Sequence, residues 1–394
     1  MSSVVISGDT SGAVTLSAPA VAGTVTVTLP SVSGTMLQSG TTVTEAQGGT
    51  GTTTGYYGFK NRIINGAMVI DQRNAGAAVT GASSFPVDRF FMRSVNDGAY
   101  SGQQDSSAPA GFTKSTKITV TTADSSLTTT QSLSIRQRVE GFNISDFGWG
   151  AAGAATVTLS FWVRSSVTGT YGGSICNGNE DRSYPFTFAI SSANTWEQKS
   201  VTIAGDTSGT WAIDNSTGLN VFFSVGAGPT YSGTAGAWSG NTYYSATGAI
   251  NMMATLNATF YITGVQLEKG STATSFDYRP YGTELALCQR YLPAWSGTSG
   301  NQDFCSAFNN TTTGTAYVLT HPMQTRVPPT GVTATGTFLL FASNNAYTVT
   351  SLTFGGSSTG ATRVSGTITA GTAGAGGSGA GQGTWNLYLT GCEL

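Results

Sequence analysis

Short runs of alternating hydrophobic and polar residues recur along the chain. In residues 156–164, Val157, Leu159, Phe161 and Val163 alternate with Thr, Ser, Trp and Arg. A period of two sends successive side chains to opposite faces of a sheet, so this run predicts a strand with one face in a core. Similar runs bounded by turn residues predict strands at 62–65, 68–70, 115–120, 133–139, 186–190, 199–203, 219–225 and 258–267. Their spacing is typical of a jelly-roll β-sandwich, here expected over residues 55–280.

Residues 1–54 differ from this central region. They contain three strand-like runs, at 4–6, 14–16 and 25–29, but few large apolar side chains. A segment of this kind cannot build a good core alone, because it buries too little apolar surface. We therefore expect it to pair with copies of itself or to dock on another protein, as an attachment and trimerisation segment. Residues 47–55, QGGTGTTTG, are typical of a flexible linker.

Residues 281–394 are expected to form a C-terminal β domain that begins with one short helix. The helix is predicted over 283–292, with Thr283 as N-cap, Glu284 at the positive end and Pro293 as the stop. Strands follow at 316–320, 336–341, 348–354 and 385–389. Residues 369–383, TAGTAGAGGSGAGQG, predict a mobile low-complexity loop between two of them.

The composition agrees with an all-β chain. Gly, Ser and Thr make up 161 of 394 residues, and only 9% are charged. Gly and β-branched Thr disfavour helices, whereas Thr suits strands and Gly suits turns. A net charge of −2 gives no basic surface for nucleic acid, and no apolar run is long enough to insert into a membrane. Residues 1–30 also lack the basic and apolar regions of a classical signal peptide.

Cysteine and histidine offer little chemistry. Cys176, Cys288, Cys305 and Cys392 have no metal-site spacing, so we expect reduced, mostly buried thiols in a protein made in a cytoplasm. His321 is the single histidine and is expected at a strand end, exposed or capping. No metal or cofactor is predicted, and no catalytic residue is assigned.

Five distinctive strings occur along the chain, preceded by a GGTG linker. The strings are FKNRIINGAMVIDQRN (59–74), FPVDRF (85–90), GDTSGTW (205–211), YITGVQLEKG (261–270) and STATSFDYRPYGTELALCQRYL (271–292). Together they resemble a module common in bacteriophage tail fibres, over about residues 45–292. The resemblance implies a jelly roll similar to carbohydrate-binding modules, in a trimeric fibre that contacts the host surface.

From this resemblance we expect a tail-fibre subunit located in the virion tail. It would attach to other tail or baseplate proteins through residues 1–54, form a homotrimer and adsorb to host-surface polysaccharide. One alternative is a purely architectural fibre or decoration protein of tail, neck or head. A polysaccharide depolymerase is less favoured, because no carboxylate pair or β-helix repeat is recognisable.

The few charges within these strings suggest structural ion pairs or backbone caps. The expected pairings are Asp71 with Arg89 or Arg73 with Asp88. Arg279, with Pro280 and Tyr281, is expected to fix the path of the chain into the helix.

Aromatic and amide side chains in loops are the candidates for glycan binding. Sugar C–H faces stack on aromatic rings, while hydroxyls bond short polar groups. The candidate residues are Trp149, Tyr171, Asn177, Asn179, Asp181, Trp238, Tyr243 and Tyr244. Aromatics in Gly-rich loops also plug sandwich ends or subunit contacts, and that interpretation stays open. Residues 177–181 could alternatively hold calcium, although a solvated turn is the favoured interpretation. Trp162, Trp196 and Trp211 are assigned to the structure.

Overall fold

The computed structural model describes residues 3–7, 13–17 and 59–394, which belong to two compact units, 1–53 and 54–394. In the first unit, β1 (Ser3–Ser7) and β2 (Ala13–Ser17) form an antiparallel hairpin in which Val4 pairs with Leu16. Two of the three predicted N-terminal strands are thereby confirmed. The strand predicted at 25–29 and the linker predicted at 47–55 lie outside the described residues. The same holds for most of residues 1–54, which are predicted to attach to the virion.

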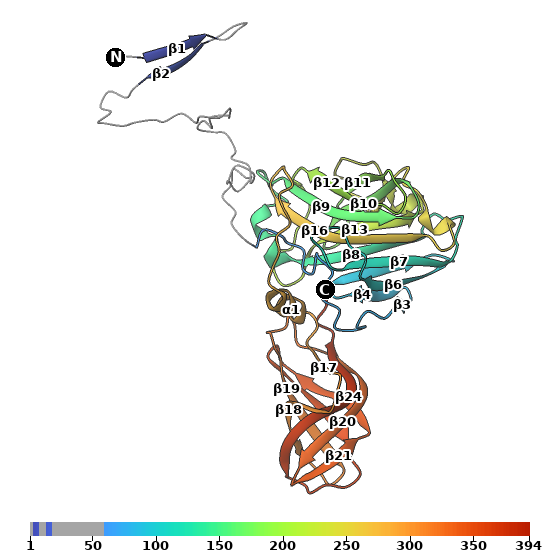
Figure 1. Ribbon diagram of the computed structural model, residues 1–394, viewed down its shortest axis with the longest axis vertical. Helices are drawn as coiled ribbons and strands as arrows, with labels where there is room; N and C mark the ends of the chain where they lie inside the picture. Colours follow the sequence, from blue (N-terminus) through green and yellow to red (C-terminus); the bar gives the residue numbers. More distant parts are fainter. Residues whose placement is uncertain (1–2, 8–12, 18–58) are drawn as a thin grey trace. The chain divides into compact units, whose positions relative to one another are not determined.

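The second unit contains a jelly-roll sandwich of two six-stranded antiparallel sheets, which confirms the predicted fold class (Figure 1). The first sheet has the order β11 (Ser183–Ile190), β10 (Gly169–Asn177), β13 (Thr217–Ala227), β8 (Ser132–Glu140), β5 (Phe90–Val95) and β4 (Ser83–Val87). The second has the order β12 (Glu197–Ile203), β9 (Val157–Ser165), β16 (Thr259–Lys269), β7 (Ser115–Thr122), β6 (Ala99–Asp105) and β3 (Val79–Thr80).

Alternation along each strand fills the space between these sheets. On β9, Val157, Leu159, Phe161 and Val163 are all fully buried, as predicted, and they pack with the inward side chains of β13 and β16. The 3-10 turns are η2 (Gly141–Asn143), η3 (Ser145–Phe147), η4 (Pro229–Tyr231) and η5 (Met252–Ala254). The short parallel pair β14 (Ser232–Gly233) and β15 (Ser245–Ala246) lies in the long connection after β13.

The strands predicted at 62–65 and 68–70 are wrong. These residues are buried or half-buried without belonging to a sheet, and side-chain amides satisfy much of their backbone. Single main-chain bonds, such as that from the Arg62 N–H to the Leu267 oxygen at 2.9 Å, supply part of the rest. Asn65 accepts a hydrogen bond from the Ile70 N–H (2.9 Å) and donates to the Ile70 oxygen (2.8 Å). Gln137 bonds both the N–H and the oxygen of Ile64. Buried hydrophobic side chains therefore produce a strand-like pattern here without strand pairing.

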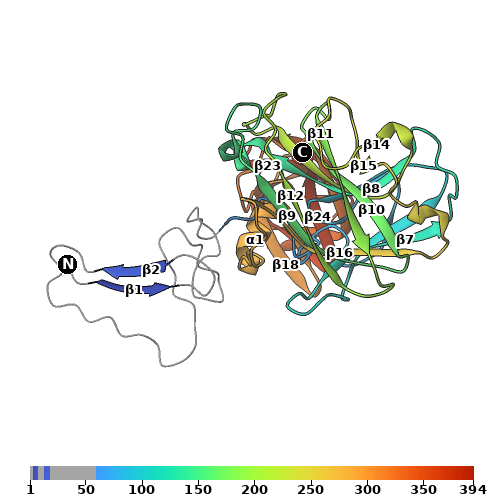
Figure 2. The same cartoon turned by 90° about the horizontal axis from the view of Figure 1, so that it is seen from above.

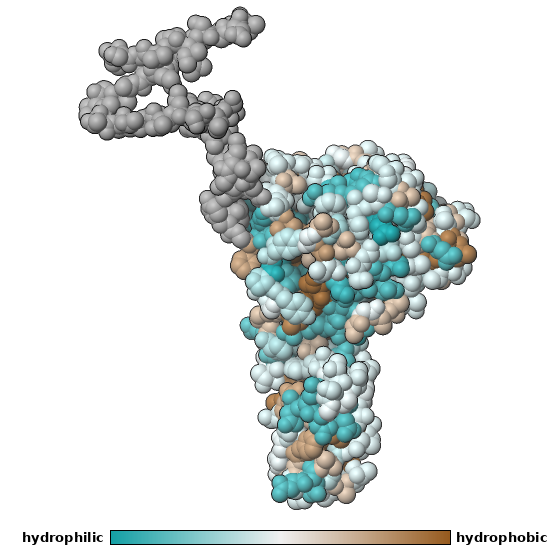
Figure 3. All heavy atoms as spheres, viewed as in Figure 1, coloured by the Kyte–Doolittle hydropathy of each residue, from teal (hydrophilic) through white to brown (hydrophobic). Residues whose placement is uncertain are grey.

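The C-terminal sheet has eight strands and its own core. Its order is β21 (Asn345–Val349), β20 (Gly331–Ala342), β24 (Gly376–Thr390), β18 (Asn301–Asn309), β19 (Gly314–Thr320), β23 (Ala361–Thr367) and β22 (Ser351–Ser357), with β17 (Ala294–Gly297) also on β24. In Figure 2, β18, β23 and β24 of this sheet are seen behind the strands of the sandwich. The one strand predicted at 348–354 is divided between β21 and β22. Much of this sheet's surface is near neutral in hydropathy, as Gly, Ser and Thr would give (Figure 3).

The mobile loop predicted over 369–383 is wrong from residue 376 onward, where β24 begins. Its glycines are there for close packing. A Cβ on Gly379 would lie 2.6 Å from the Cys305 sulfur, and one on Gly381 would lie 2.1 Å from the Trp385 ring. Glycine is the residue that admits such contacts inside a strand, so its abundance imitated a loop composition.

The helix α1 (Tyr281–Gln289) joins the two cores, and its N-cap is Pro280 rather than the predicted Thr283. Glu284 lies in the first turn of the helix, as predicted, and it also accepts from the Asn65 N–H and pairs with Arg279 at 3.3 Å. Arg279 also donates to the Ile63 oxygen at 3.1 Å, so it does fix the path into the helix.

An ion pair between a half-buried arginine and a buried glutamate joins the sandwich to the segment after α1. Arg290 binds both carboxylate oxygens of Glu140, at 2.9 and 2.5 Å, and the Tyr291 hydroxyl donates to Glu140 at 2.6 Å. Burial alone would raise the pKa of Glu140, but the bonds from Arg290 and Tyr291 hold that pKa below its usual value. The two cores therefore meet through specific polar contacts.

Candidate functional site

Trp149 and Trp238 lie with Trp211 in one cluster instead of lining an open loop. Ring centroids are 4.6 Å apart for Trp149 and Trp211, 5.3 Å for Trp149 and Trp238, and 5.5 Å for Trp211 and Trp238, all edge to face. Each indole N–H donates to a main-chain carbonyl: Trp149 to Ala155, Trp211 to Ser208 and Trp238 to Ala204. Trp149 and Trp211 are buried and Trp238 is half-buried. We call these three residues the tryptophan cluster; its rings and donors are used within the chain.

Tyr171 is misplaced by the sequence prediction. It lies on β10, fully buried, with its hydroxyl 2.7 Å from the Ser165 oxygen and donating to the Val167 carbonyl at 2.9 Å. Burial raises the pKa of Tyr171 to about 12. The Gly residues that follow it belong to the strand and not to a loop, so Tyr171 is a core residue.

The predicted polar candidates lie in the turn after β10. The Asn177 side chain is fully buried: its oxygen accepts from the Asp181 and Arg182 N–H groups, both at 3.1 Å, and its amide donates to Asp181 Oδ1 at 2.6 Å. Asn179 and Asp181 are exposed at the tip. Asn177 therefore shapes this turn, and the turn holds Glu180 with a left-handed φ of 58°.

The outer side of β5 and β8 carries an arginine-rich group of buried and half-buried side chains that the sequence prediction missed. Because Phe90, Met92, Ile135 and Val139 face the core, the alternate residues face outward. We call this set the arginine face: Phe91, Arg93, Ser134, Arg136 and Arg138. Register pairs Phe91 with Arg136 and Arg93 with Ser134 across the two strands.

Aromatic rings border this face. Phe222, Tyr244 and Tyr231 form a stack with centroids 4.6 Å apart at each step. The Arg93 guanidinium lies 4.4 Å from the Tyr244 centroid, and the Arg136 guanidinium lies 5.1 Å from that of Phe91. Of the predicted glycan candidates, Tyr244 is thus beside the arginine face, though buried; Tyr243 is half-buried one residue away.

Glu180 connects the turn after β10 to the arginine face. Its carboxylate accepts from Arg136 Nη1 at 2.6 Å and from the Tyr244 hydroxyl at 2.8 Å. Four polar atoms of the arginine face and its neighbour Ser132 are buried without a hydrogen-bond partner in the described chain: Arg93 Nη1, Ser132 Oγ, Ser134 Oγ and Arg136 Nε. Buried polar atoms usually have hydrogen-bond partners, so these two guanidinium nitrogens and two hydroxyl groups could bond a ligand.

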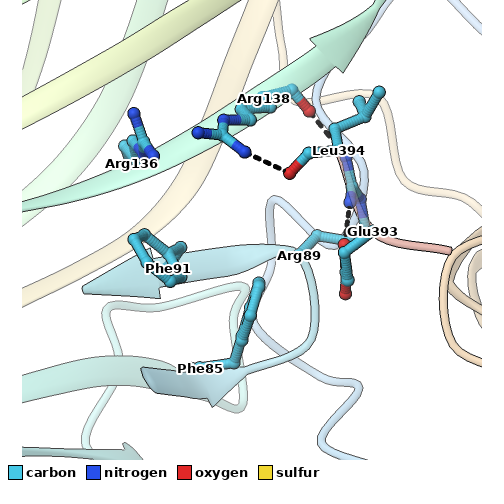
Figure 4. Close-up of a pocket in the computed structure, with 7 residues that line it drawn as sticks. All are labelled: Phe85, Arg89, Phe91, Arg136, Arg138, Glu393 and Leu394. Carbon is cyan, nitrogen blue, oxygen red and sulfur yellow. Dashed lines mark hydrogen bonds and ion pairs between the residues drawn. The ribbon is translucent and has the colours of Figure 1, made fainter. Parts of the chain in front are cut away.

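A pocket of about 200 Å³ continues from this face (Figure 4). Arg136 and Arg138 come from β8, Phe91 from β5 and Phe85 from β4, while Glu393 and Leu394 close the far side. Arg138 donates to the main-chain oxygen of Leu394, and Arg89 pairs with Glu393. Phe85 and Phe91 meet edge to face at 5.1 Å. The pocket therefore combines aromatic rings with guanidinium groups.

The arginines of this region disfavour one another's charge. Burial is the largest cause that lowers the pKa of Arg136 to about 10, and Arg138 and Arg93 lower it further against the opposing effect of Glu180. Burial also lowers the pKa of Arg138, with Arg89 and Arg93 acting in the same direction. Cations held this close, with little solvent, favour the arrival of an anion.

The predicted ion pairs are found in part. Arg73 lies 3.4 Å from Asp88 and 2.7 Å from Glu393. Asp71 instead caps a turn, accepting from the Asn74 and Gly76 N–H groups at 3.1 and 2.7 Å, and no Asp71–Arg89 pair occurs among the described residues. Burial raises the pKa of Asp88 to about 6 despite Arg73 and Gln72. Arg73, Asp88, Arg89 and Glu393 form a charge-balanced network behind the pocket.

His321 follows the end of β19 but is buried, not exposed. Its ring nitrogens lie 2.9 Å from the Thr359 carbonyl and 2.9 Å from the Thr362 hydroxyl. Burial lowers the pKa of His321. All four cysteines are free thiols, with Cys305 half-buried and the others buried, as predicted. In the part of the chain that the structure describes, no cluster of metal-ligating side chains and no helix suited to crossing a membrane is found.

The outer face of the second sheet carries another aromatic group. Trp196 and Tyr261 meet edge to face at 6.1 Å, and the Arg164 guanidinium lies 5.0 Å from the Tyr261 centroid. Arg164 also donates to the Ser107 hydroxyl at 2.8 Å. Trp162 and Trp196 are half-buried here.

A sequence signal for the arginine face existed. In SLSIRQRVE, residues 132–140, the hydrophobic positions alternate with Ser134, Arg136 and Arg138. Two of only 17 basic residues therefore share one face of one predicted strand. Sequence reasoning weighed loop aromatics and passed over strand positions. It could not have found Tyr231, which reaches the face through the connection after β13.

No protein-family model and no curated protein matches the chain. Among solved structures, the enzymatically active domain of tailspike protein 4 from bacteriophage CBA120 is similar at 10% identity and a TM-score of 0.30, covering 54% of this chain. The chain spans 22% of that tailspike chain. A putative sugar-binding protein from Bacteroides thetaiotaomicron matches at 13% identity and 0.31, covering 53% of this chain and 100% of its own. The family 11 carbohydrate-binding module of Clostridium thermocellum Lic26A-Cel5E matches at 11% identity and a TM-score of 0.26. The match covers 51% of this chain and 99% of that module's chain.

Proposed function

We propose that this chain is a non-enzymatic bacteriophage tail-fibre subunit that binds host-surface glycan at the arginine face. One observation carries the binding site: aromatic rings and partnerless polar atoms share one outer sheet face that continues into a pocket. Sugars need both kinds of group, since their C–H faces stack on rings while their hydroxyls need donors and acceptors. The tryptophan cluster, by contrast, has its indole donors already bonded.

The fibre role is supported by the sequence strings that resemble tail-fibre modules. Two of these strings, 59–74 and 271–292, meet in the fold: Asn65 and Glu284 are hydrogen bonded, and Arg279 donates to the Ile63 carbonyl. The proposal includes a place in the virion tail, attachment through residues 1–54 and a homotrimer. A threefold assembly would multiply weak contacts with a repetitive surface.

The absence of catalysis is part of the proposal. Glycosidases keep two carboxyl groups at a defined separation, one able to donate a proton. The carboxylates beside the arginine face are each held by cations: Glu180 by Arg136 at 2.6 Å, and Glu393 by Arg73 at 2.7 Å and by Arg89. Paired carboxylates of this kind favour a recognition surface over an acid–base pair.

The test compares two faces of the sandwich. Host-surface polysaccharide is titrated into full-length protein by calorimetry, with Tyr231→Ala on the arginine side and Trp196→Ala as the matched aromatic control on the second sheet. We expect Tyr231→Ala to weaken binding by about 1–3 kcal/mol and Trp196→Ala to leave it unchanged. The reverse pattern would place the site on the second sheet.

Further readouts test the other parts of the proposal. Released reducing ends would show a depolymerase, and gold labelling of virions away from the tail would exclude the fibre role. Protein that sediments as a monomer would exclude the trimer.

A further inference from the structure

The charges on the arginine face are not balanced. Arg136 is neutralised by Glu180, and Arg89 by Glu393. Arg93 and Arg138 have no side-chain carboxylate partner among residues 59–394. Arg138 still donates to the main-chain oxygen of Leu394, whereas Arg93 has no hydrogen-bond acceptor for its Nη1 in the described chain. A neutral sugar would leave Arg93 without a counter-charge.

The position of Arg93 is that of a recognition group. Its guanidinium carbon lies 4.4 Å from the centroid of the Tyr244 ring and 5.8 Å from the centroid of the Tyr231 ring. This stacking holds the planar group in place without using its N–H donors, and Nη1 has no partner in the described chain. A guanidinium held this way can present two parallel N–H groups to a carboxylate or phosphate.

Rings lie on both sides of this charge. Tyr231 is half-buried next to Arg93, and Phe91 is half-buried across the face beside Arg136. A pyranose ring stacked on either aromatic group would bring an acidic substituent within reach of the arginines. The strands fix this spacing, because Phe91 and Arg136 are directly paired and Arg93 pairs with Ser134, two residues along on both strands.

We infer that the arginine face selects an anionic saccharide, one that carries a carboxylate or a phosphate group, and that Arg93 is the residue that binds the acidic group. This inference rests on the proposed glycan binding and adds the chemical class of the ligand. Uronic acids and sugar phosphates share the chemistry that a guanidinium recognises in two-point geometry. Neutral glycans with the same backbone are bound less well.

A panel of immobilised saccharides tests this with the full-length chain. It contains uronate oligomers, their methyl esters, sialylated and phosphorylated oligosaccharides, and neutral oligosaccharides. We expect the bound members to be acidic, methyl esterification to weaken binding at least about tenfold, and affinity to fall as salt rises from about 20 to 300 mM. Inorganic phosphate alone, at the same concentration, separates anion binding from saccharide binding.

Variants of Arg93 sharpen the result. Arg93→Gln replaces the charged guanidinium with a neutral amide. We expect it to weaken binding of the acidic saccharides about 10- to 100-fold. Arg93→Lys keeps the charge without the planar fork and should fall between this variant and the native protein. Arg363→Gln, which removes an exposed arginine on β23, is the matched control and should change nothing. Thermal unfolding of each variant shows whether the fold is kept.

The outcomes separate the two proposals. Neutral members bound as tightly as acidic ones, with loss on Tyr231→Ala, would overturn the anionic preference and leave glycan binding in place. Inorganic phosphate competing as well as the acidic saccharides would overturn saccharide selection. Binding of no member at all would remove both proposals. Loss of acidic binding in Arg363→Gln as large as in Arg93→Gln would show a general charge effect and overturn the role of Arg93.

Discussion

The tryptophan cluster and the arginine face both bring aromatic rings together, but they differ in how many of their polar groups lack a hydrogen-bond partner. In the cluster, three rings meet edge to face and each indole N–H has a carbonyl acceptor. On the arginine face, rings stack beside guanidinium groups, and buried polar atoms remain without partners. Aromatic content alone therefore does not indicate a binding site. Unused donors and charge beside the rings are the better sign.

The largest expected effect is on the tryptophan cluster. Trp149→Ala should lower the free energy of unfolding by about 3–5 kcal/mol, because it removes a buried ring that packs on two others. Urea unfolding measures this loss. Glycan affinity of the folded fraction should stay within about twofold. A variant as stable as the native chain but defective in binding would contradict the structural role.

The next effect concerns Asp88, which supports the pocket beside the arginine face. Its pKa is about 6 in the folded protein against 3.8 ordinarily, so the folded state holds this proton longer than the unfolded state does. The contribution of Asp88 to stability is therefore largest below pH 4 and is lost as pH rises through about 6, a change of about 3 kcal/mol. Urea unfolding from pH 4 to pH 7 should show the native chain losing stability relative to Asp88→Asn. The exposed Asp97→Asn is the control and should follow the native chain. A stability difference between the native chain and Asp88→Asn that stays constant from pH 4 to pH 7 would refute the assignment.

A smaller effect separates two asparagines in the turn beside the face. Asn177→Ala should cost about 2 kcal/mol, because it leaves the Asp181 and Arg182 N–H groups and the Thr210 carbonyl without their bonds. Asn179→Ala, at the exposed tip, should change stability by less than about 0.5 kcal/mol. Chemical unfolding of both variants gives the comparison. Equal costs would show that the turn is not organised by Asn177.

The smallest stability effect is expected on the arginine face itself. Arg93→Ala removes a guanidinium from the Tyr244 ring, a contact worth about 0.5–1 kcal/mol at a partly exposed site, and it also relieves repulsion from Arg136 and Arg138. We expect a net change in unfolding free energy below about 1 kcal/mol. Trp149→Ala and Arg93→Ala should thus be opposites, one affecting stability and the other binding. A melting temperature lowered as much by Arg93→Ala as by Trp149→Ala would break the distinction.

Much of the sandwich could be predicted from alternation, and the exceptions share a cause. The strands β7, β8, β9, β11, β12, β13 and β16 were predicted within a few residues of their bounds. The segments at 62–65 and 68–70 were predicted as strands, yet Asn65 and Gln137 bond their backbone from the side. Local pattern reports burial, whereas strand pairing depends on partners distant in the sequence.

The all-β class, the inward faces of the strands and the scarcity of charge could all be inferred from the order of residues. These follow from side-chain period and composition, which are local properties. Which aromatic residues are packed inside and which border a face depends on contacts between distant parts of the chain. Trp149 and Tyr171 looked like loop residues until contacts with Trp211 and Ser165 placed them inside. Arg93, Arg136 and Arg138 became a site because β5 and β8 are neighbours and a connection from β13 lays Tyr231 and Tyr244 beside them. Register and chain crossing set those distances, and neither is written in any local stretch of residues.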